Sequence, residues 1–322
     1  MIESSGSITR TRVSGLLRFI RRIIIAFLWL AALTGFHVIY GWPMMVSVVM
    51  FFALPVIGWY FYSEKILRIG AIMGFLGMIV CLGSITPSNN RDWATGFSVL
   101  PRVRISDQQV IIEGFRNFRW RGPHEFDPVW ETRSFDLRRL ESLDLVVEPF
   151  KDSELMAHTM LRFGFGENEY LIVSVEARAE KHEKYSLIAG ALRQFELIYL
   201  FGSESDFLTV RAVHRGARLY MFPIKAERRF MVDLFRDLAS SANALHFEPK
   251  FYRSIRDNCT TTLVKHFDRQ HQEHIGLRYE TLFPALTGKL LHRMGYMDTT
   301  YPYEEAKEHF RVDERIRKSQ PY

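Results

Sequence analysis

The amino-acid sequence predicts an α+β protein in which an N-terminal three-helix transmembrane anchor precedes a larger domain with an antiparallel sheet. Three long apolar runs fill the first quarter of the 322 residues. Short segments of strand-like composition then follow one another between residues 109 and 224. Two helical segments come after the strands. The second of these helices begins at a cysteine and is expected to carry a nucleophile.

The predicted anchor consists of the apolar runs 23–42, 43–62 and 67–86. Each run has about 20 residues and would form a helix about 30 Å long, which matches the hydrocarbon core of a bilayer. A cleavable signal peptide has one apolar region of about 7–15 residues, so three successive runs do not fit it. We therefore expect three membrane-spanning helices within residues 23–87.

The orientation of the anchor is predicted from its basic residues. Residues 1–22 contain a single acid, Glu3, and five arginines, which are Arg10, Arg12, Arg18, Arg21 and Arg22. Basic residues beside a span favour the cytoplasmic side, so this segment is expected to be a cytoplasmic basic tail. Three spans then place residues 88–322, enough for one domain, on the periplasmic side. The predicted location is the inner membrane, with a multi-pass anchor.

The charge pattern limits the classes of partner that the domain is expected to bind. The formal net charge is +6 at pH 7, and part of it comes from the basic tail. The sequence has no nucleic-acid-binding motif and no Gly-rich phosphate loop, so nucleic acid is not an expected partner. Arg215 and Arg218, or Arg228 and Arg229, could meet anionic lipid headgroups. A solvated surface is the simpler interpretation of these four residues.

The expected secondary structure of the domain is a run of strands followed by helices. The strands are predicted over 109–115, 143–150, 157–165, 169–178, 194–202, 206–213 and 217–224, with Gly, Ser and charged turns between them. An amphipathic helix is predicted over 226–246, and a second helix starts near residue 257. The remaining C-terminal segment is expected to be helical with a frayed end.

Cys259 is the only cysteine in residues 88–322, so a disulfide within the domain is excluded. Asp257 and Asn258 are good N-cap residues, and apolar residues follow at helical spacing, which places Cys259 in the first helical turn. Free backbone N–H groups and the helix dipole stabilise a thiolate there. Cys259 is thus a predicted nucleophile, and a small buried residue in a helix cap is the alternative.

The first histidines that follow Cys259 in the sequence are not suitable bases. His266 shares its helix face, yet it lies about 10 Å further along the axis. His271, Glu273 and His274 do not have the spacing of a standard metal site. Neither a metal nor another cofactor is therefore expected.

His158 is the predicted partner of the thiol. The segments 157–165 and 169–178 are joined by a short turn and are expected to form a hairpin. With a three-residue loop, Phe165 pairs with Glu169, and His158 then faces Glu176 on the same side of the sheet. Glu176 would orient the imidazole, and Ser174 would do so if the register differs. A strand histidine beside a surface carboxylate is the alternative interpretation.

Seven ordered blocks of sequence within residues 89–266 resemble the Lnb-type N-terminal periplasmic domain family. The blocks are NNRDW, IEGFRNFRW, RSFDLRRLESLDLVVEPF, AHTMLRFGF, YLIVSVEAR, FELIYLFGSESDFLTVR and RDNCTTTLVKH. The resemblance implies a circularly permuted papain-like (NlpC-type) fold in which the histidine strand precedes the cysteine helix. The order of His158 and Cys259 along this chain matches that arrangement.

The resemblance also implies an activity, that of a bacterial lipoprotein N-acyltransferase. Such an enzyme would move an acyl chain from a phospholipid at the membrane to a lipoprotein N-terminus. The expected route is a thioester on Cys259, with His158 as the base and backbone N–H groups stabilising the oxyanion. Two other classes stay open from the sequence. One is a papain-like cysteine amidase or peptidase acting on cell-wall peptides, and the other is a non-catalytic membrane scaffold.

Overall fold

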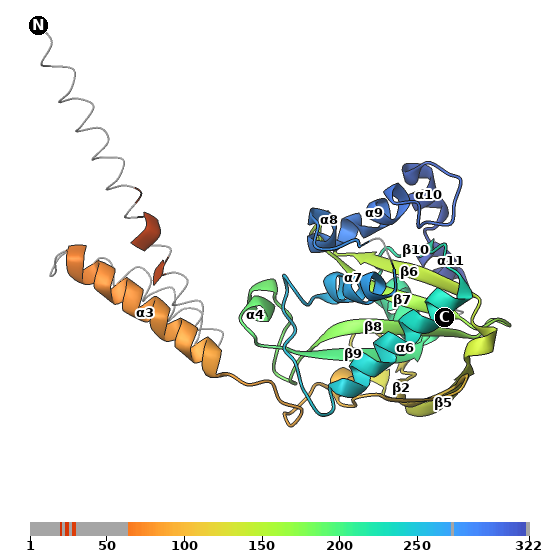
Figure 1. Cartoon of the computed structure of the whole chain (residues 1–322), viewed down its shortest axis with the longest axis horizontal. Helices are drawn as coiled ribbons and strands as arrows, with labels where there is room; N and C mark the ends of the chain where they lie inside the picture. Colours follow the sequence, from red (N-terminus) through yellow and green to blue (C-terminus); the bar gives the residue numbers. More distant parts are fainter. Residues whose placement is uncertain (1–19, 21–22, 26–27, 30–63, 272–273, 320–322) are drawn as a thin grey trace, which may run out of the picture. The chain divides into compact units, whose positions relative to one another are not determined.

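The computed structural model describes residues 20, 23–25, 28–29, 64–271 and 274–319 (Figure 1). The chain divides into two compact units. One comprises Met1–Thr86 with Leu192–Gln194, and the other comprises Pro87–Ala191 with Phe195–Tyr322. The second unit contains all strands of the described residues and, as shown below, the predicted site residues.

The predicted three-helix transmembrane anchor is wrong. In the part of the chain that the structure describes, no helix is long and apolar enough to cross a membrane. The third predicted span corresponds to α3 (Glu64–Ser84), whose first turns carry Glu64, Lys65 and Arg68. Residues 69–84 are left without charge, and at ~1.5 Å per residue they cover about 24 Å, less than a bilayer core of ~30 Å. The tail 1–22 and the other two predicted spans lie almost entirely outside the described residues.

The second unit is a mixed α/β fold built on an eight-stranded sheet. The strand order is β1-β2-β9-β8-β7-β6-β10, and β5 also pairs with β2. The bounds are β1 (Arg102–Ser106), β2 (Gln109–Arg116), β5 (Trp130–Asp136), β6 (Ser142–Pro149), β7 (Ala157–Gly164), β8 (Tyr170–Arg178), β9 (Glu196–Ser203) and β10 (Tyr220–Pro223). Neighbouring strands are antiparallel except for the single parallel contact between β2 and β9. A small separate sheet joins β3 (Arg119–Trp120) and β4 (Phe126–Asp127).

The predicted hairpin between β7 and β8 has the predicted register. The Phe165 N–H donates to the carbonyl of Glu169, which leaves the three-residue loop 166–168. All three loop residues have positive φ, including 76° at Gly166. The backbone pairing runs from Gly164 opposite Tyr170 to Met160 opposite Ser174 and stops there. The start of β7, where His158 lies, is therefore not paired with β8.

The predicted strand 206–213 is wrong, because this segment is helical. It forms α5 (Glu204–Thr209) and the π-helical turn η3 (Val210–His214). The N–H of Asp206 donates to the Ser203 hydroxyl at the N-terminus of α5, and Glu204 in the first turn favours the positive end of the helix dipole. Asp206 itself is buried and accepts two hydrogen bonds from Arg116. These contacts outweigh the strand propensity of the valines and threonine in the segment.

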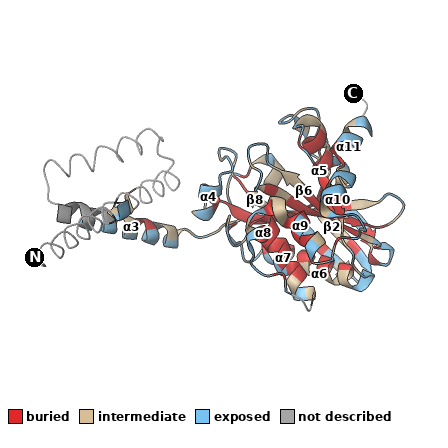
Figure 2. Cartoon of the chain, turned by 90° about the horizontal axis from the view of Figure 1, so that it is seen from above, coloured by how far each residue is buried: buried red, intermediate tan, exposed pale blue. Residues whose placement is uncertain are grey.

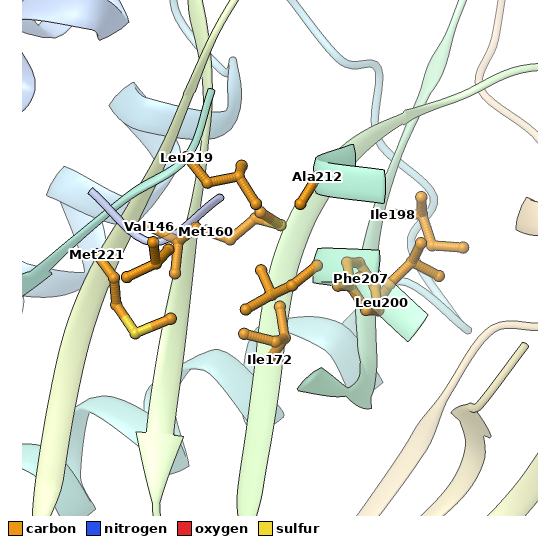
Figure 3. Packing of buried hydrophobic residues seen from close by; sticks show 11 residues of the cluster. Val146, Met160, Ile172, Ile198, Leu200, Phe207, Ala212, Leu219 and Met221 are labelled. Carbon is orange, nitrogen blue, oxygen red and sulfur yellow. The ribbon is translucent and has the colours of Figure 1, made fainter. Parts of the chain in front are cut away.

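Helices lie on both faces of the sheet, with α5 on one side and α6 (Arg228–Ala244) and α7 (Cys259–Gln270) on the other (Figure 2). On one face α5 and η3 pack on a buried cluster drawn in Figure 3, which includes Val146, Met160, Ile172, Ile198, Leu200, Phe207, Ala212, Leu219 and Met221. On the other face, Phe235 of α6 meets the ring of Phe163 edge-on, with 5.4 Å between centroids. Figure 2 shows buried residues concentrated in the strands and along α6 and α7.

Short helices complete the unit. They are α4 (Leu187–Ala191), α8 (Tyr279–Leu282), α9 (Thr287–Arg293), α10 (Tyr303–His309) and α11 (Asp313–Ser319), with 3₁₀ turns η1 (Thr95–Phe97), η2 (Leu137–Arg139) and η4 (Pro284–Leu286). The turn η4 packs on β6 and β7 near the start of β7. It thereby closes one side of the region around His158.

Candidate active site

The N-terminus of α7 is fixed by a capping box. The Asn258 side chain accepts a hydrogen bond from the Thr261 N–H at 2.8 Å, and the Asn258 N–H donates to the Thr261 hydroxyl at 3.0 Å. The amide of Asn258 also donates to the carbonyl of Ser254. Cys259 is the first residue of the helix, as predicted, and its side chain is buried, with 4% exposed.

The thiol of Cys259 lies against the main chain at the start of β7. Its sulfur is 3.9 Å from the carbonyl oxygen of Ala157. The next residue of the helix, Thr260, shares a 3.0 Å hydrogen bond with Thr159 through their hydroxyl groups. Helix α7 therefore contacts β7 through the residues immediately before and immediately after His158.

His158 is held by the two residues that the hairpin register predicted as alternatives. Its Nε2 is 3.1 Å from Glu176 Oε1 and 2.8 Å from the Ser174 hydroxyl. The Ser174 hydroxyl in turn donates to Glu176 Oε1 at 2.7 Å. Glu176 and Ser174 are two positions apart in β8, so their side chains share a face and both reach the imidazole. Since Nε2 is occupied, Nδ1 is the ring nitrogen left for the thiol.

The charges of these groups stabilise one another. Burial would lower the pKa of His158, but the negative charges of Glu176 and Cys259 outweigh it and raise this pKa to about 10. Burial would raise the pKa of Cys259, yet the charge of His158 and hydrogen bonds from His158 and Thr159 lower it. The pKa of Glu176 is also lowered, because the charge of His158 overcomes its burial. These shifts favour a thiolate on Cys259 beside an imidazolium on His158.

Arg211 of the π-helical turn completes the charge balance. Glu148 of β6 lies directly opposite His158 in the sheet, so two glutamates flank the imidazole. Arg211 Nε is 2.8 Å from Glu148 Oε2, and its Nη2 is 3.5 Å from Glu176 Oε1. Its Nη1 donates to the Phe207 carbonyl. Arg211 neutralises Glu148 and also helps to keep Glu176 ionised.

These residues open into one cavity of about 640 Å³. Cys259, His158, Glu176 and Arg211 all contribute to its lining. Much of the rest of the lining is apolar or aromatic: Phe97, Phe150, Met156, Val175, Tyr185, Leu187 and Tyr252. Cys259 therefore faces a space that has both apolar and charged walls.

Tyr252 is a candidate hydrogen-bond donor that sequence reasoning missed. It lines the cavity, only 4% of it is exposed, and burial followed by the negative charge of Cys259 raises its pKa. Its hydroxyl therefore keeps its proton, and it is hydrogen-bonded to Tyr185. A turn of this hydroxyl away from Tyr185 would let it donate to an oxyanion. The only sequence signal is its position seven residues before Cys259. Arg211 was also missed, because its segment was predicted to be a strand.

His266 lies outside this cavity. Its Nε2 is 2.7 Å from the Tyr199 hydroxyl and its Nδ1 is 2.8 Å from Asp237, so it links α7 to β9 and α6. No group of three or more His, Cys, Asp or Glu side chains that could hold a metal occurs among the described residues. Glu273 lies outside them.

The fold and the site define a class of protein: an α/β domain with a buried cysteine at a helix N-terminus and a histidine on the neighbouring strand, both lining one cavity. The sequence model of the Lnb N-terminal periplasmic domain matches residues 126–293, just over half of the chain, and the chain belongs to this family. The matched region includes His158, Glu176, Arg211 and Cys259. No curated protein and no solved structure matches the chain, so the expected papain-like fold has no structural relative to support it.

The lowered pKa of Cys259 predicts the pH dependence of its reactivity. In a Cys81→Ser background, which leaves one cysteine, alkylation by iodoacetamide should reach half its maximal rate below pH ~8.5, the value for an ordinary cysteine. The rate should fall at lower pH as the thiolate is protonated. In His158→Ala the midpoint should move to higher pH, because burial is then opposed only by the hydrogen bonds of Thr159. A wild-type midpoint at or above that of a free cysteine would contradict the ion pair.

Replacing Glu176 should affect the imidazole more than replacing Ser174. Glu176→Gln removes the charge that raises the pKa of His158, so this pKa should fall from about 10. Ser174→Ala removes hydrogen bonds but no charge, and the pKa of His158 should change less. NMR titration of labelled histidines measures the pKa of His158 in both variants. The signal of His158 is assigned by its absence in His158→Ala. Equal shifts in the two variants would mean that hydrogen bonding, and not charge, sets this pKa.

Tyr252→Phe should slow acylation of Cys259 without slowing its alkylation. Attack on an ester creates an oxyanion, whereas attack on iodoacetamide does not. Loss of one oxyanion donor typically costs ~10²–10³-fold, and we expect about 10²-fold because the N–H groups of α7 remain. The measurement compares a short activated ester with iodoacetamide on the same variant. A parallel loss with both reagents would assign Tyr252 a role in thiolate formation instead.

Proposed function

We propose that this protein transfers an acyl chain from a phospholipid to the amino terminus of a bacterial lipoprotein through a thioester on Cys259. The observation that carries the proposal is that Cys259, at the N-terminus of α7, and His158 line one cavity whose wall is in large part apolar. Membership of a periplasmic domain family supports it, since lipoprotein N-termini and phospholipids meet at the periplasmic face of the inner membrane.

In the first step the thiolate of Cys259 attacks an ester carbonyl of the phospholipid. The N–H groups at the start of α7, together with the Tyr252 hydroxyl, stabilise the oxyanion. The C–O bond to glycerol then breaks, and the imidazolium of His158 gives its proton to the departing alkoxide. A thioester on Cys259 and a lysophospholipid are formed.

In the second step the neutral amine of the lipoprotein N-terminus attacks the thioester carbonyl. His158, now neutral, takes a proton from the amine as the new C–N bond forms. The C–S bond breaks and the thiolate leaves, so the amide product is released and the starting ion pair returns. Glu176 remains ionised throughout and holds the imidazole in place.

The apolar lining favours this reaction over the cell-wall alternative. An acyl chain can fill the space between Phe97, Phe150 and Met156 and exclude water, which keeps the thioester from hydrolysis. A cell-wall peptide is polar and carries carboxylates, and it would leave these walls exposed to water. Amidase activity on cell-wall peptides is therefore the alternative result that the test must be able to detect.

The test follows acyl transfer from a labelled phospholipid to a diacylglyceryl-cysteine peptide in vesicles that contain the full chain. Cys259→Ser and His158→Ala should each lower transfer by at least about 10³-fold, and the double variant should lose no more, because the two residues act as one unit. In the wild type without acceptor, a hydroxylamine-sensitive acyl adduct should accumulate on Cys259.

A matched control variant distinguishes a loss of catalysis from a loss of folding. His266→Gln changes a histidine on the nucleophile helix that lies outside the cavity, so its transfer rate should stay within a few-fold of wild type if its thermal unfolding is unchanged. Near-normal transfer by Cys259→Ser or His158→Ala would overturn the proposal. Release of amino acids from cell-wall peptides, with no acyl adduct, would favour the amidase.

A further inference from the structure

Arg215 is a cation on the wall of the Cys259 cavity. It follows the π-helical turn η3, and its N–H donates to the Val210 carbonyl. Its guanidinium is 6.0 Å from the ring centroid of Trp120, and the indole N–H of Trp120 is fixed by a 2.8 Å hydrogen bond to buried Asp206. Arg215 is an exposed residue that lines the cavity, so its head group can meet a ligand.

The charge of Arg215 is not balanced in the way that the charge of Arg211 is. Arg211 uses its donors on Glu148, Glu176 and a carbonyl. Among the described residues, no carboxylate lies within ion-pair distance of Arg215. Surrounding protein atoms, followed by the charge of Arg211, lower the pKa of Arg215. A bound anion would offset both effects, and the five N–H donors of a guanidinium suit an oxyanion.

The other residues that line the cavity indicate which class of ligand would carry that anion. Lys184 places a second cation on the cavity wall, while Phe97, Phe150 and Met156 make other parts of it apolar. Three carboxylates also line the cavity, but Glu148 and Glu176 contact Arg211, and Glu183 accepts a hydrogen bond from the Glu180 N–H. A ligand that satisfies all of these groups has an apolar chain, an ester for Cys259 and an anionic head. A glycerophospholipid has these three parts joined through one glycerol.

We propose that Arg215 binds the phosphate group of the acyl donor and makes the site selective for phosphate-bearing lipids. This inference rests on the proposed function and deepens it. Arginine can form two parallel hydrogen bonds to a phosphodiester, which fixes orientation as well as charge. Arg215 is thereby a specificity residue, whereas Cys259 and His158 carry the chemistry.

The experiment compares two donors with the same acyl esters, phosphatidylglycerol and diacylglycerol, presented to the full chain in neutral mixed micelles. The rate of thioester formation on Cys259 is measured. Arg215→Gln should slow reaction with phosphatidylglycerol by about 10–100-fold, the loss expected for a charge-assisted hydrogen bond, and should leave reaction with diacylglycerol unchanged. Arg215→Lys should retain part of the preference.

Arg218 offers a matched control. It lies three residues further along and is exposed, but it lines a separate cavity of about 750 Å³. Arg218→Gln removes the same charge and should leave both donor rates unchanged. If Arg218→Gln reduced the phosphatidylglycerol rate as much as Arg215→Gln does, general attraction to an anionic lipid would replace the proposed specific contact.

A binding assay tests the contact without turnover. A long-chain alkyl phosphate has the apolar chain and the phosphate but no ester, and it should protect Cys259 from iodoacetamide in the wild type but not in Arg215→Gln. Equal protection in both would overturn the inference. Equal loss with both donors in Arg215→Gln would overturn it too, since a structural role would have that effect. Failure of wild-type Cys259 to accept acyl groups from any donor, with protection intact, would contradict the proposed function alone.

Discussion

The negative charge of Glu176, partly buried beside His158, is stabilised by positive charge on both sides. His158 supplies it on one side and Arg211 on the other. Arg211 also forms an ion pair with Glu148. The groups form an alternating series that ends at the thiol of Cys259. Breaking a buried ion pair leaves an uncompensated charge at a typical cost of ~3–5 kcal/mol, so each member depends on the others. A thiolate can exist in this apolar cavity because the series supplies an imidazolium beside it.

Three local features bring the members of this series together. The three-residue loop 166–168 fixes the hairpin register, which sets Glu176 against His158. The capping box at Asn258 starts α7 at the thiol, and the bond between Thr159 and Thr260 holds that helix on β7. The π-helical turn directs Arg211 toward the sheet, and such turns commonly occur at functional sites. The backbone pairing of β7 with β8 ends before His158, and this leaves room for the thiol at the open end of the ladder.

The features predicted from the sequence are those set by neighbours in the chain. A loop length fixes a hairpin register, and Asn258 marks a helix start, so His158, Glu176 and Cys259 could be named from the residues. The roles of Asp206 and Arg211, the charged residues in the segment 206–213, could not be predicted from the residues. Its composition favours a strand, and its helical form depends on contacts distant in sequence, such as that between Asp206 and Arg116. The membrane anchor was predicted from the length and apolar composition of three runs, and these do not determine whether a run forms one continuous apolar helix of spanning length.

The same charge series explains how one histidine could serve both steps of the proposed reaction. The pKa of His158 is raised first by Glu176 and then by the thiolate of Cys259. Before acylation the imidazole is therefore protonated and can act as an acid toward the leaving alkoxide. Formation of the thioester removes the thiolate charge and its hydrogen bond, which lowers the pKa of His158 toward the range in which it can accept a proton from the amine. The charge of Glu176 persists through both steps, so the imidazole keeps its orientation while its protonation state changes with the state of Cys259.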